Sequence, residues 1–198
     1  LAVTMTRSKK AIQLYRKHAR PVLARIVHRN SCITQARITY EVLTRLGVPA
    51  SPICTSLVVT APHLKLSYIT GFTDEERDAI HAKCAAWVDK RDPTEPGWRG
   101  HVCVLTQSGY LIDTSLDQAS SPDRGMLILP DVLIAKIGVE HLMGKSLHLR
   151  IDTALEFPLE VSYYPRDDVS FKESEAWQLL PHIEDVVKLI QQGIEREL

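Results

Sequence analysis

The chain has 198 residues, of which 44% are hydrophobic and 24% are charged, and its 24 Lys and Arg residues are balanced by 24 Asp and Glu residues. A chain of this length and composition buries a core without cross-links, which excludes disordered, collagen-like and disulfide-scaffold proteins. The balanced charge gives no overall attraction to nucleic acid or to an anionic membrane, so we expect neither partner.

Cysteine usage indicates a reducing compartment. The four cysteines, Cys32, Cys54, Cys84 and Cys103, form no C-x-x-C pair, so neither a disulfide framework nor a zinc site is expected. The sequence also lacks the apolar run of roughly 18 residues needed to span a bilayer, and the apolar segment of a signal peptide. We therefore expect a soluble, cytoplasmic protein that needs no cofactor; its oligomeric state stays open.

A basic helix is expected first, over residues 8–29, with a kink or break at Pro21. Basic residues recur from Arg7 to Arg29 without an acid among them. A solvated helix face is the favoured interpretation of this run, and a surface that binds a partner is the alternative.

A second helix is predicted to begin near Cys32. Asn30 and Ser31 are good N-cap residue types, and Gly47 with Pro49 supplies a stop signal. Between them apolar residues recur at helical spacing: Ile33, Ala36, Tyr40, Leu43 and Leu46. This pattern places Cys32 in the first turn of the helix.

The middle of the chain is predicted to alternate strands with one helix. Residues 52–60 are rich in β-branched side chains and indicate a strand. A helix is expected over 73–90, with Thr73 and Glu76 as a capping box, followed by a Pro- and Gly-rich loop over 91–100.

A β-hairpin is the most informative prediction. Residues 101–106 (HVCVLT) and 110–113 (YLID) read as two strands joined by a turn at Gly109. Beyond it, 126–143 is ambiguous, with a short helix after Pro130 as one interpretation. Strands are expected over 147–151 and 157–164, and a closing helix over 173–197 with an interruption near Pro181.

Three residues in these elements suit nucleophilic catalysis. A thiol must ionise to act as a nucleophile, and the positive end of a helix dipole favours the thiolate at Cys32. His101 begins one hairpin strand and Asp113 ends the other, so the carboxylate can reach one imidazole nitrogen while the other nitrogen faces the thiol. We predict that Cys32 is a nucleophile, His101 its base and Asp113 the residue that orients the base.

The segments NSCITQARITYEVLTRLGVPA, GWRGHVCVL and GYLIDTSLDQ carry a family resemblance. Together they resemble the transglutaminase-like and arylamine N-acetyltransferase-like branches of the papain-like superfamily, over residues 30–118. The resemblance implies an α+β fold in which N-terminal helices, with the nucleophile at a helix start, pack on an antiparallel sheet. It also implies a Cys32–His101–Asp113 triad that forms a thioester. The whole chain, 1–198, is then one domain: a basic helix (1–29), a catalytic core (30–118) and C-terminal strands and helix (119–198).

Several roles stay open at this stage. Trp98 is expected to form a wall of the site or to anchor the loop, His28 is a candidate to line the cleft, and Gln118 is expected either to support the site or only to cap the turn after Asp113. Papain-like peptidases carry a glutamine before the cysteine, but Ile26 and Val27 stand there, so no oxyanion donor is assigned.

The other cysteines are expected to be packing residues. Cys54, Cys84 and Cys103 fall inside predicted strands or helices, and Cys103 is the strongest competitor for the nucleophile because it shares a strand face with His101.

Two functions follow from these expectations. One is a cysteine-dependent amide or peptide hydrolase, or an acyltransferase, acting on a peptide, protein or small acyl substrate. The alternative is an inactive papain-like module that binds a peptide or protein partner.

Overall fold

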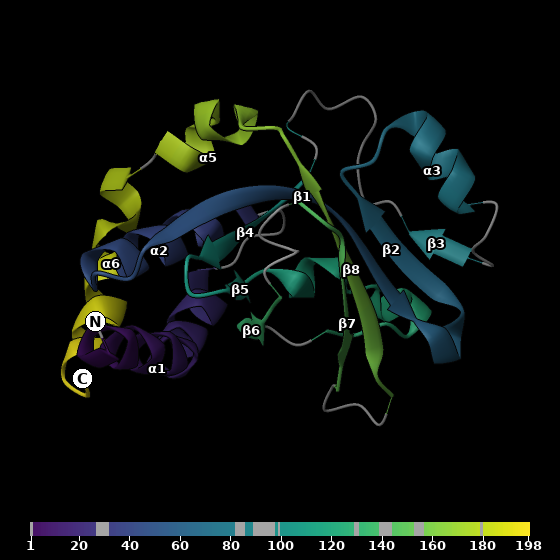
Figure 1. Ribbon diagram of the computed structural model, residues 1–198. Coiled ribbons are helices and arrows are strands. Elements are labelled where there is room, and N and C mark those ends of the chain that lie inside the picture. The colour runs from purple at the N-terminus through teal and green to yellow at the C-terminus, as the bar shows by residue number, and fades with distance from the viewer. Residues whose placement is uncertain are drawn as a thin grey trace.

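The computed structural model describes residues 2–26, 32–81, 86–88, 98, 100–128, 131–138, 144–152, 157–178 and 180–198. The architecture is α+β, with helices packed on a curled, mainly antiparallel sheet (Figure 1). The helices are α1 (Ala2–Ile26), α2 (Cys32–Arg45), α3 (Asp74–His81), α5 (Glu175–Gln178) and α6 (Leu180–Glu195), with the 3-10 turns η1 (Pro62–Leu64), η2 (Leu116–Ala119), η3 (Pro122–Arg124) and η4 (Ser170–Glu173). The strands are β1 (Ala50–Ala61), β2 (Leu66–Thr70), β3 (Ala86–Val88), β4 (His101–Thr106), β5 (Tyr110–Asp113), β6 (Leu133–Lys136), β7 (Leu147–Ile151) and β8 (Leu159–Arg166).

The long strand β1 organises the sheet. The strand order is β3-β2-β1-β4-β5-β6, and β8, which pairs with β7, also pairs with β1. The first half of β1 pairs with β4, so Thr55 lies opposite His101, and its second half pairs with β2. Strand β8 pairs with β1 from Cys54 to Thr60 and sets Tyr163 opposite Leu57. Segments far apart in the sequence therefore meet beside the middle of β1.

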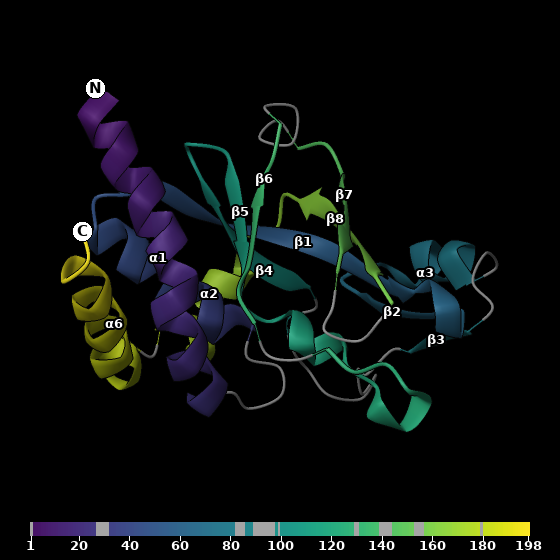
Figure 2. The ribbon, with the colours of Figure 1, turned by 90° about the horizontal axis from the view of Figure 1, so that it is seen from below.

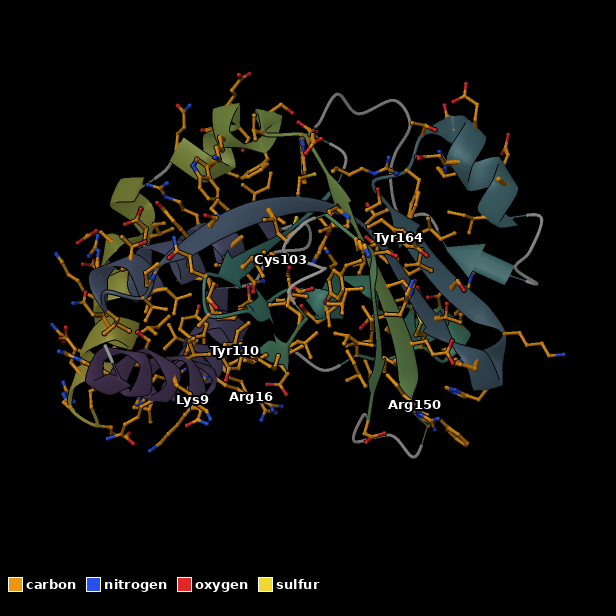
Figure 3. The ribbon with its side chains drawn as sticks, viewed as in Figure 1. Lys9, Arg16, Cys103, Tyr110, Arg150 and Tyr164 are labelled. Atoms are coloured by element: carbon orange, nitrogen blue, oxygen red, sulfur yellow. The ribbon has the colours of Figure 1, made fainter. Side chains whose placement is uncertain are left out.

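Helix α1 buries one stripe and exposes its basic residues. The buried residues recur at helical spacing: Ala11, Ile12, Tyr15, Ala19 and Leu23. The described basic residues, such as Lys9 and Arg16, lie on the solvent side, as predicted for a solvated face (Figure 3). The predicted break at Pro21 is wrong, because α1 continues through it to Ile26. Pro21 is itself exposed, so water can satisfy the carbonyl that loses its helical partner.

Helix α2 begins at Cys32 and ends at Arg45, as its apolar spacing predicts. The predicted capping residues Asn30 and Ser31 lie outside the described residues. The helix packs against β1, β4 and α6, and its buried face includes Cys32, Ile38 and Leu43. The first turn of α2 is thereby held against the start of the hairpin.

Helix α3 begins as predicted but ends earlier. The capping box forms: the Thr73 N–H donates to the Glu76 carboxylate at 2.9 Å, and the Glu76 N–H donates to the Thr73 hydroxyl at 3.2 Å. The predicted continuation to residue 90 is wrong, because α3 ends at His81 and residues 86–88 form β3, parallel to β2. The partner strand β2 supplies backbone hydrogen bonds that the local pattern could not indicate.

Residues 131–138 also differ from the prediction. The short helix considered after Pro130 is wrong, because Leu133–Lys136 forms β6 along the free edge of β5. The other predicted elements are present: the hairpin, with Gly109 at φ +78°, the strands β7 and β8, and a C-terminal helical region divided into α5 and α6. Helix α6 contains Pro181 in its first turn, where a proline costs no helical hydrogen bond.

The sheet separates two apolar cores. Helices α1, α2 and α6 gather against one face of β1, β4 and β5 and enclose the first core (Figure 2). The opposite face carries the second core, which includes Cys103, Leu111 and Tyr163 and is bordered by β7, β8 and the turn η2. No helix in the described part of the chain is long and apolar enough to cross a membrane.

Candidate active site

His101 and Asp113 are brought together by the hairpin. Val104 lies opposite Ile112 and Leu105 opposite Leu111, so the odd-numbered residues of β4 and β5 share one face. On that face His101 Nε2 lies 2.7 Å from Asp113 Oδ2, and both side chains are fully buried. The carboxylate therefore fixes the orientation of the imidazole.

Asp113 is held by donors on both oxygens. Oδ1 accepts a hydrogen bond from the Ser115 N–H at 3.0 Å, and Oδ2 accepts one from the Tyr163 hydroxyl at 2.8 Å. Burial raises the pKa of Asp113, but His101 and these donors lower it by more, so that the pKa lies below its usual value. Asp113 is therefore an anion in the folded protein at neutral pH.

Tyr163 is a site residue that the sequence analysis missed. Its strand was predicted, and the alternation of Leu159, Val161 and Tyr163 indicates one buried face. The pairing of β8 with β1, which delivers the hydroxyl to Asp113, depends on contacts between distant segments. The sequence gives one indication of this contact: Tyr163 lies on the buried face of a predicted strand, where its hydroxyl needs a hydrogen-bond partner.

The imidazole of His101 is strongly basic. Burial lowers its pKa, but the charge and hydrogen bond of Asp113, together with the Cys32 thiol, raise the pKa to about 10. An imidazolium in this position balances the charge of Asp113 and, once Cys32 has ionised, attracts the thiolate.

Cys32 is placed at the positive end of α2. Its side chain is 6% exposed, and the first turn of the helix contains no acidic residue to oppose an anion. The thiol is within hydrogen-bonding reach of His101. Because Asp113 occupies Nε2, the nitrogen that remains for Cys32 is Nδ1. The structure thus brings together all three residues of the predicted triad.

Gln118 lies at the same imidazole nitrogen. Its Nε2 is 2.5 Å from His101 Nδ1, from a position in the turn η2 just after the hairpin. When Nδ1 is unprotonated it accepts a hydrogen bond, and the Gln118 amide donates it. Gln118 therefore contacts the second ring nitrogen of His101 and does more than cap the turn after Asp113.

Trp98 is anchored beside the start of β4. Its indole Nε1–H donates to Asp168 at 2.9 Å, and its ring packs edge-on against Phe171. The ring also covers Gly100, where a Cβ atom would lie 2.5 Å from it, so only glycine fits next to His101. Trp98 thus anchors the segment that leads into His101. His28, the other candidate for the cleft, lies outside the described residues.

Cys54 and Cys103 are unsuited to act as nucleophiles. Burial raises the pKa of Cys103 well above its usual value, and nearby Asp113 adds to this effect. Burial, with Asp168 and Cys32 nearby, raises the pKa of Cys54 to about 12. Both remain neutral thiols at neutral pH, which removes Cys103 as a competitor of Cys32. Cys84 lies outside the described residues.

Comparison with known proteins yields no match: no protein-family model, no curated protein and no solved structure corresponds to this chain.

Proposed function

We propose that the chain is a cysteine-dependent acyl-transfer enzyme with a papain-like or transglutaminase-like fold, in which Cys32 is the nucleophile. The observation that carries this proposal is the buried imidazole of His101, held on one side by Asp113 at 2.7 Å and reached on the other by the thiol that begins α2. A nucleophile, a base and a residue that orients the base are the three parts that acyl transfer through a thioester requires.

The first step forms the thioester. Because its raised pKa keeps His101 protonated at neutral pH, Cys32 enters the reaction as the thiolate paired with this imidazolium, and its sulfur attacks the carbonyl carbon of an amide or ester. The C–S bond forms as the carbonyl electron pair moves to oxygen. When this tetrahedral intermediate collapses, the C–N or C–O bond breaks, and the leaving group takes the proton from His101. Asp113 stabilises the imidazolium throughout this step.

The second step releases the acyl group. Water or an amine gives a proton to His101 and attacks the thioester carbonyl, the C–S bond breaks, and Cys32 leaves as the thiolate that pairs again with the His101 imidazolium. Hydrolysis and transfer to an amine differ only in this acceptor. Peptides, proteins and small amides or esters are therefore all substrates that this chemistry can serve.

The oxyanion has two sources of donors. The first N–H groups of α2, the helix that Cys32 begins, have no partner within the helix. The side chain of Gln118 is the second source, because its amide lies at Nδ1, where the thiol and the imidazole meet. While Nδ1 carries its proton it does not accept from Gln118, and the amide N–H can turn towards the oxyanion.

Alkylation by iodoacetamide tests the nucleophile. An ordinary cysteine is only a few per cent thiolate at pH 7, so a thiolate paired with imidazolium is expected to react about tenfold faster. We expect Cys32 to be alkylated faster than every other cysteine and His101→Ala to remove this advantage. The rates are read from the masses of the cysteine-containing peptides over time.

His148→Ala is the matched control, because the exposed His148 on β7 forms a hydrogen bond with the Ser162 hydroxyl and packs against Tyr164. This variant should alkylate like the parent chain. If Cys32 reacted no faster than Cys54 and Cys103, the enzyme would be excluded and a binding module would remain.

Gln118→Ala is expected to separate acyl transfer from simple alkylation. Loss of one oxyanion donor lowers the rate of acyl transfer by about 10²-fold or more, whereas alkylation passes through no oxyanion. We therefore expect slow acylation by p-nitrophenyl acetate together with nearly unchanged alkylation by iodoacetamide. Gln107→Ala, in the exposed turn of the hairpin, is the control. An equal fall in both rates would show that Gln118 acts only by holding His101.

A further inference from the structure

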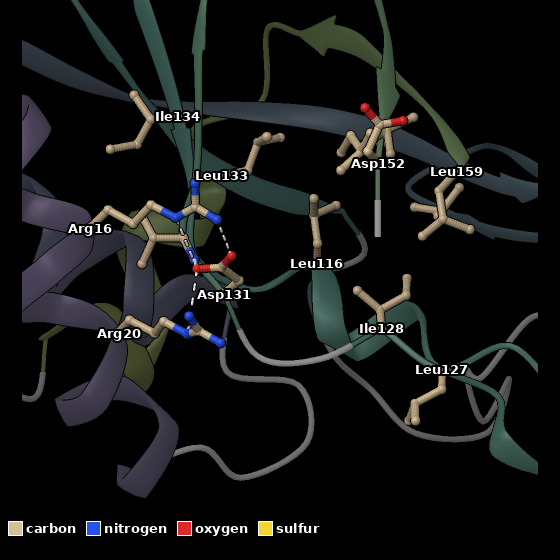
Figure 4. Close-up of a pocket in the computed structure, with 14 residues that line it drawn as sticks. Arg16, Arg20, Leu116, Leu127, Ile128, Asp131, Leu133, Ile134, Asp152 and Leu159 are labelled. Atoms are coloured by element: carbon tan, nitrogen blue, oxygen red, sulfur yellow. Dashed lines mark hydrogen bonds and ion pairs between the residues drawn. The ribbon is translucent and has the colours of Figure 1, made fainter. Parts of the chain in front are cut away.

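A cavity of about 270 Å³ lies between α1, the turn η2 and the strands β6, β7 and β8 (Figure 4). Its lining is mainly aliphatic. Besides four charged residues, it consists of Val59, Leu116, Leu127, Ile128, Val132, Leu133, Ile134, Ile151, Leu159 and Val161. The volume lies just below the range typical of sites for drug-sized ligands, so the cavity suits a small apolar group rather than a large cofactor.

The cavity adjoins the candidate active site through three of its walls. Leu133 lies directly opposite Asp113 in the β5–β6 pair, so their side chains are about 5 Å apart. Val161 precedes Tyr163 by two residues on one face of β8, a separation of about 7 Å. Leu116 belongs to the same short turn as Gln118. The walls β6, β8 and η2 therefore lie next to Asp113, Tyr163 and Gln118, respectively.

A much smaller cavity, of about 10 Å³, lies beside the first one on the side of the nucleophile. It shares Arg20, Asp131 and Val132 with the first cavity and reaches Gln35 and Thr114. Gln35 lies one helical turn after Cys32, and Thr114 follows Asp113 directly. Residues next to Cys32 and Asp113 thus lie on the far side of the wall formed by Arg20, Asp131 and Val132.

Charged side chains are confined to the rim. Asp131 accepts hydrogen bonds from Arg16 and lies 3.7 Å from Arg20 Nε, so its charge is already matched on the α1 side (Figure 4). Asp152 is exposed on the opposite side. The side chains away from the rim are therefore aliphatic, as an alkyl chain requires.

We propose that this aliphatic cavity binds the alkyl part of the acyl donor and so selects medium-length aliphatic acyl groups for transfer to Cys32. The reaction at Cys32 rests on the proposed function, whereas the selectivity for alkyl groups rests on the cavity. The alkyl group can belong to a fatty acyl chain or to an aliphatic amino acid, and both share the same apolar chemistry.

A series of p-nitrophenyl esters tests the selectivity in the full chain. Burying each additional CH2 group is expected to raise the acylation rate about fourfold until the cavity is full. We expect the rate to rise from acetate through butanoate to hexanoate, as followed by p-nitrophenolate release and compared with a small free thiol. An N-acetyl-leucine ester that outperforms hexanoate would identify an amino acid as the source. A series as flat as that of the free thiol would overturn the proposal.

Two variants of Ile151 locate the effect in the cavity. Ile151→Trp fills the space and should abolish the preference for hexanoate over acetate, whereas Ile151→Ala enlarges it and should move the preference to longer chains. Leu149→Trp is the matched control, because Leu149 lies on the same face of β7 but does not line the cavity. An unchanged hexanoate-to-acetate ratio in Ile151→Ala, or an equal loss in Ile151→Trp and Leu149→Trp, would overturn the proposal.

Binding to a chain without the nucleophile separates the two hypotheses. Cys32→Ala should bind hexanamide more tightly than acetamide in a calorimetric titration, and Ile151→Trp added to it should remove the difference. Such binding supports the cavity even if Cys32 shows no selective alkylation. Selective alkylation of Cys32 without a preference for hexanamide retains the enzyme and overturns the cavity.

Discussion

Replacing Asp113 by Asn is expected to lower the rate of acyl transfer by about 10⁴-fold, the effect of this exchange in a Ser-His-Asp triad. The amide is nearly isosteric with the carboxylate, but its NH2 group can donate to His101 Nε2. The imidazole then carries its proton on Nδ1 and cannot accept one from Cys32. The measurement is the rate of acylation by a p-nitrophenyl ester, compared with the parent chain.

A second variant separates catalysis from folding. Asp113→Ala leaves the buried groups of His101, Ser115 and Tyr163 without their acceptor, and removing one partner of a buried charge pair costs about 3–5 kcal/mol of unfolding free energy. Asp113→Asn keeps one acceptor oxygen and should lose less stability in urea. Asp123→Asn, on the exposed turn η3, should change neither property. Parent-like acylation in Asp113→Asn would rule out the triad.

The sequence predicts those residues of the site whose positions depend on local structure, namely His101, Asp113 and Cys32. His101 and Asp113 belong to one hairpin, whose turn at Gly109 determines which residues share a face. Cys32 opens a helix whose apolar spacing is regular over four turns. These features depend on neighbours in the sequence, and for this reason they can be read from it.

The remaining features depend on long-range packing. The short strands β3 and β6 exist because β2 and β5 offer them unpaired edges, whereas the local pattern predicts a helix at the position of β3 and is ambiguous at that of β6. Tyr163 reaches Asp113 only because β8 pairs with β1. The aliphatic cavity combines residues of α1, η2 and three strands, so no single segment indicates it.

The burial of the His101–Asp113 pair supports a functional role. Taking two charged groups out of water costs more than their attraction usually returns, so apolar residues would stabilise the sheet at least as well. Groups with strongly shifted pKa values cluster instead at functional sites. The pair also meets a thiol at a helix start and the amide of Gln118. A purely structural polar cluster requires neither of these neighbours.

The same pair is expected to make the stability of the fold depend on pH. The pKa of His101 is raised from its ordinary value of about 6.5 to about 10, so the folded state holds a proton that the unfolded state releases. Its stabilising contribution is complete below pH 6.5 and is lost as the pH rises towards 10. The pKa of Asp113 is lowered, so its contribution is present above about pH 4 and is lost as the pH falls below that value.

Urea unfolding at pH 5.5 and pH 9.5 measures this dependence. Between these values the parent chain is expected to lose a few kcal/mol more of unfolding free energy than His101→Gln, which has no proton to release. His148→Gln, altered at an exposed histidine, should follow the parent chain. If the parent chain and His101→Gln lost equal stability over this range, the imidazole would not be held as a cation by Asp113, and the charge pair on which the proposed thiolate depends would be absent.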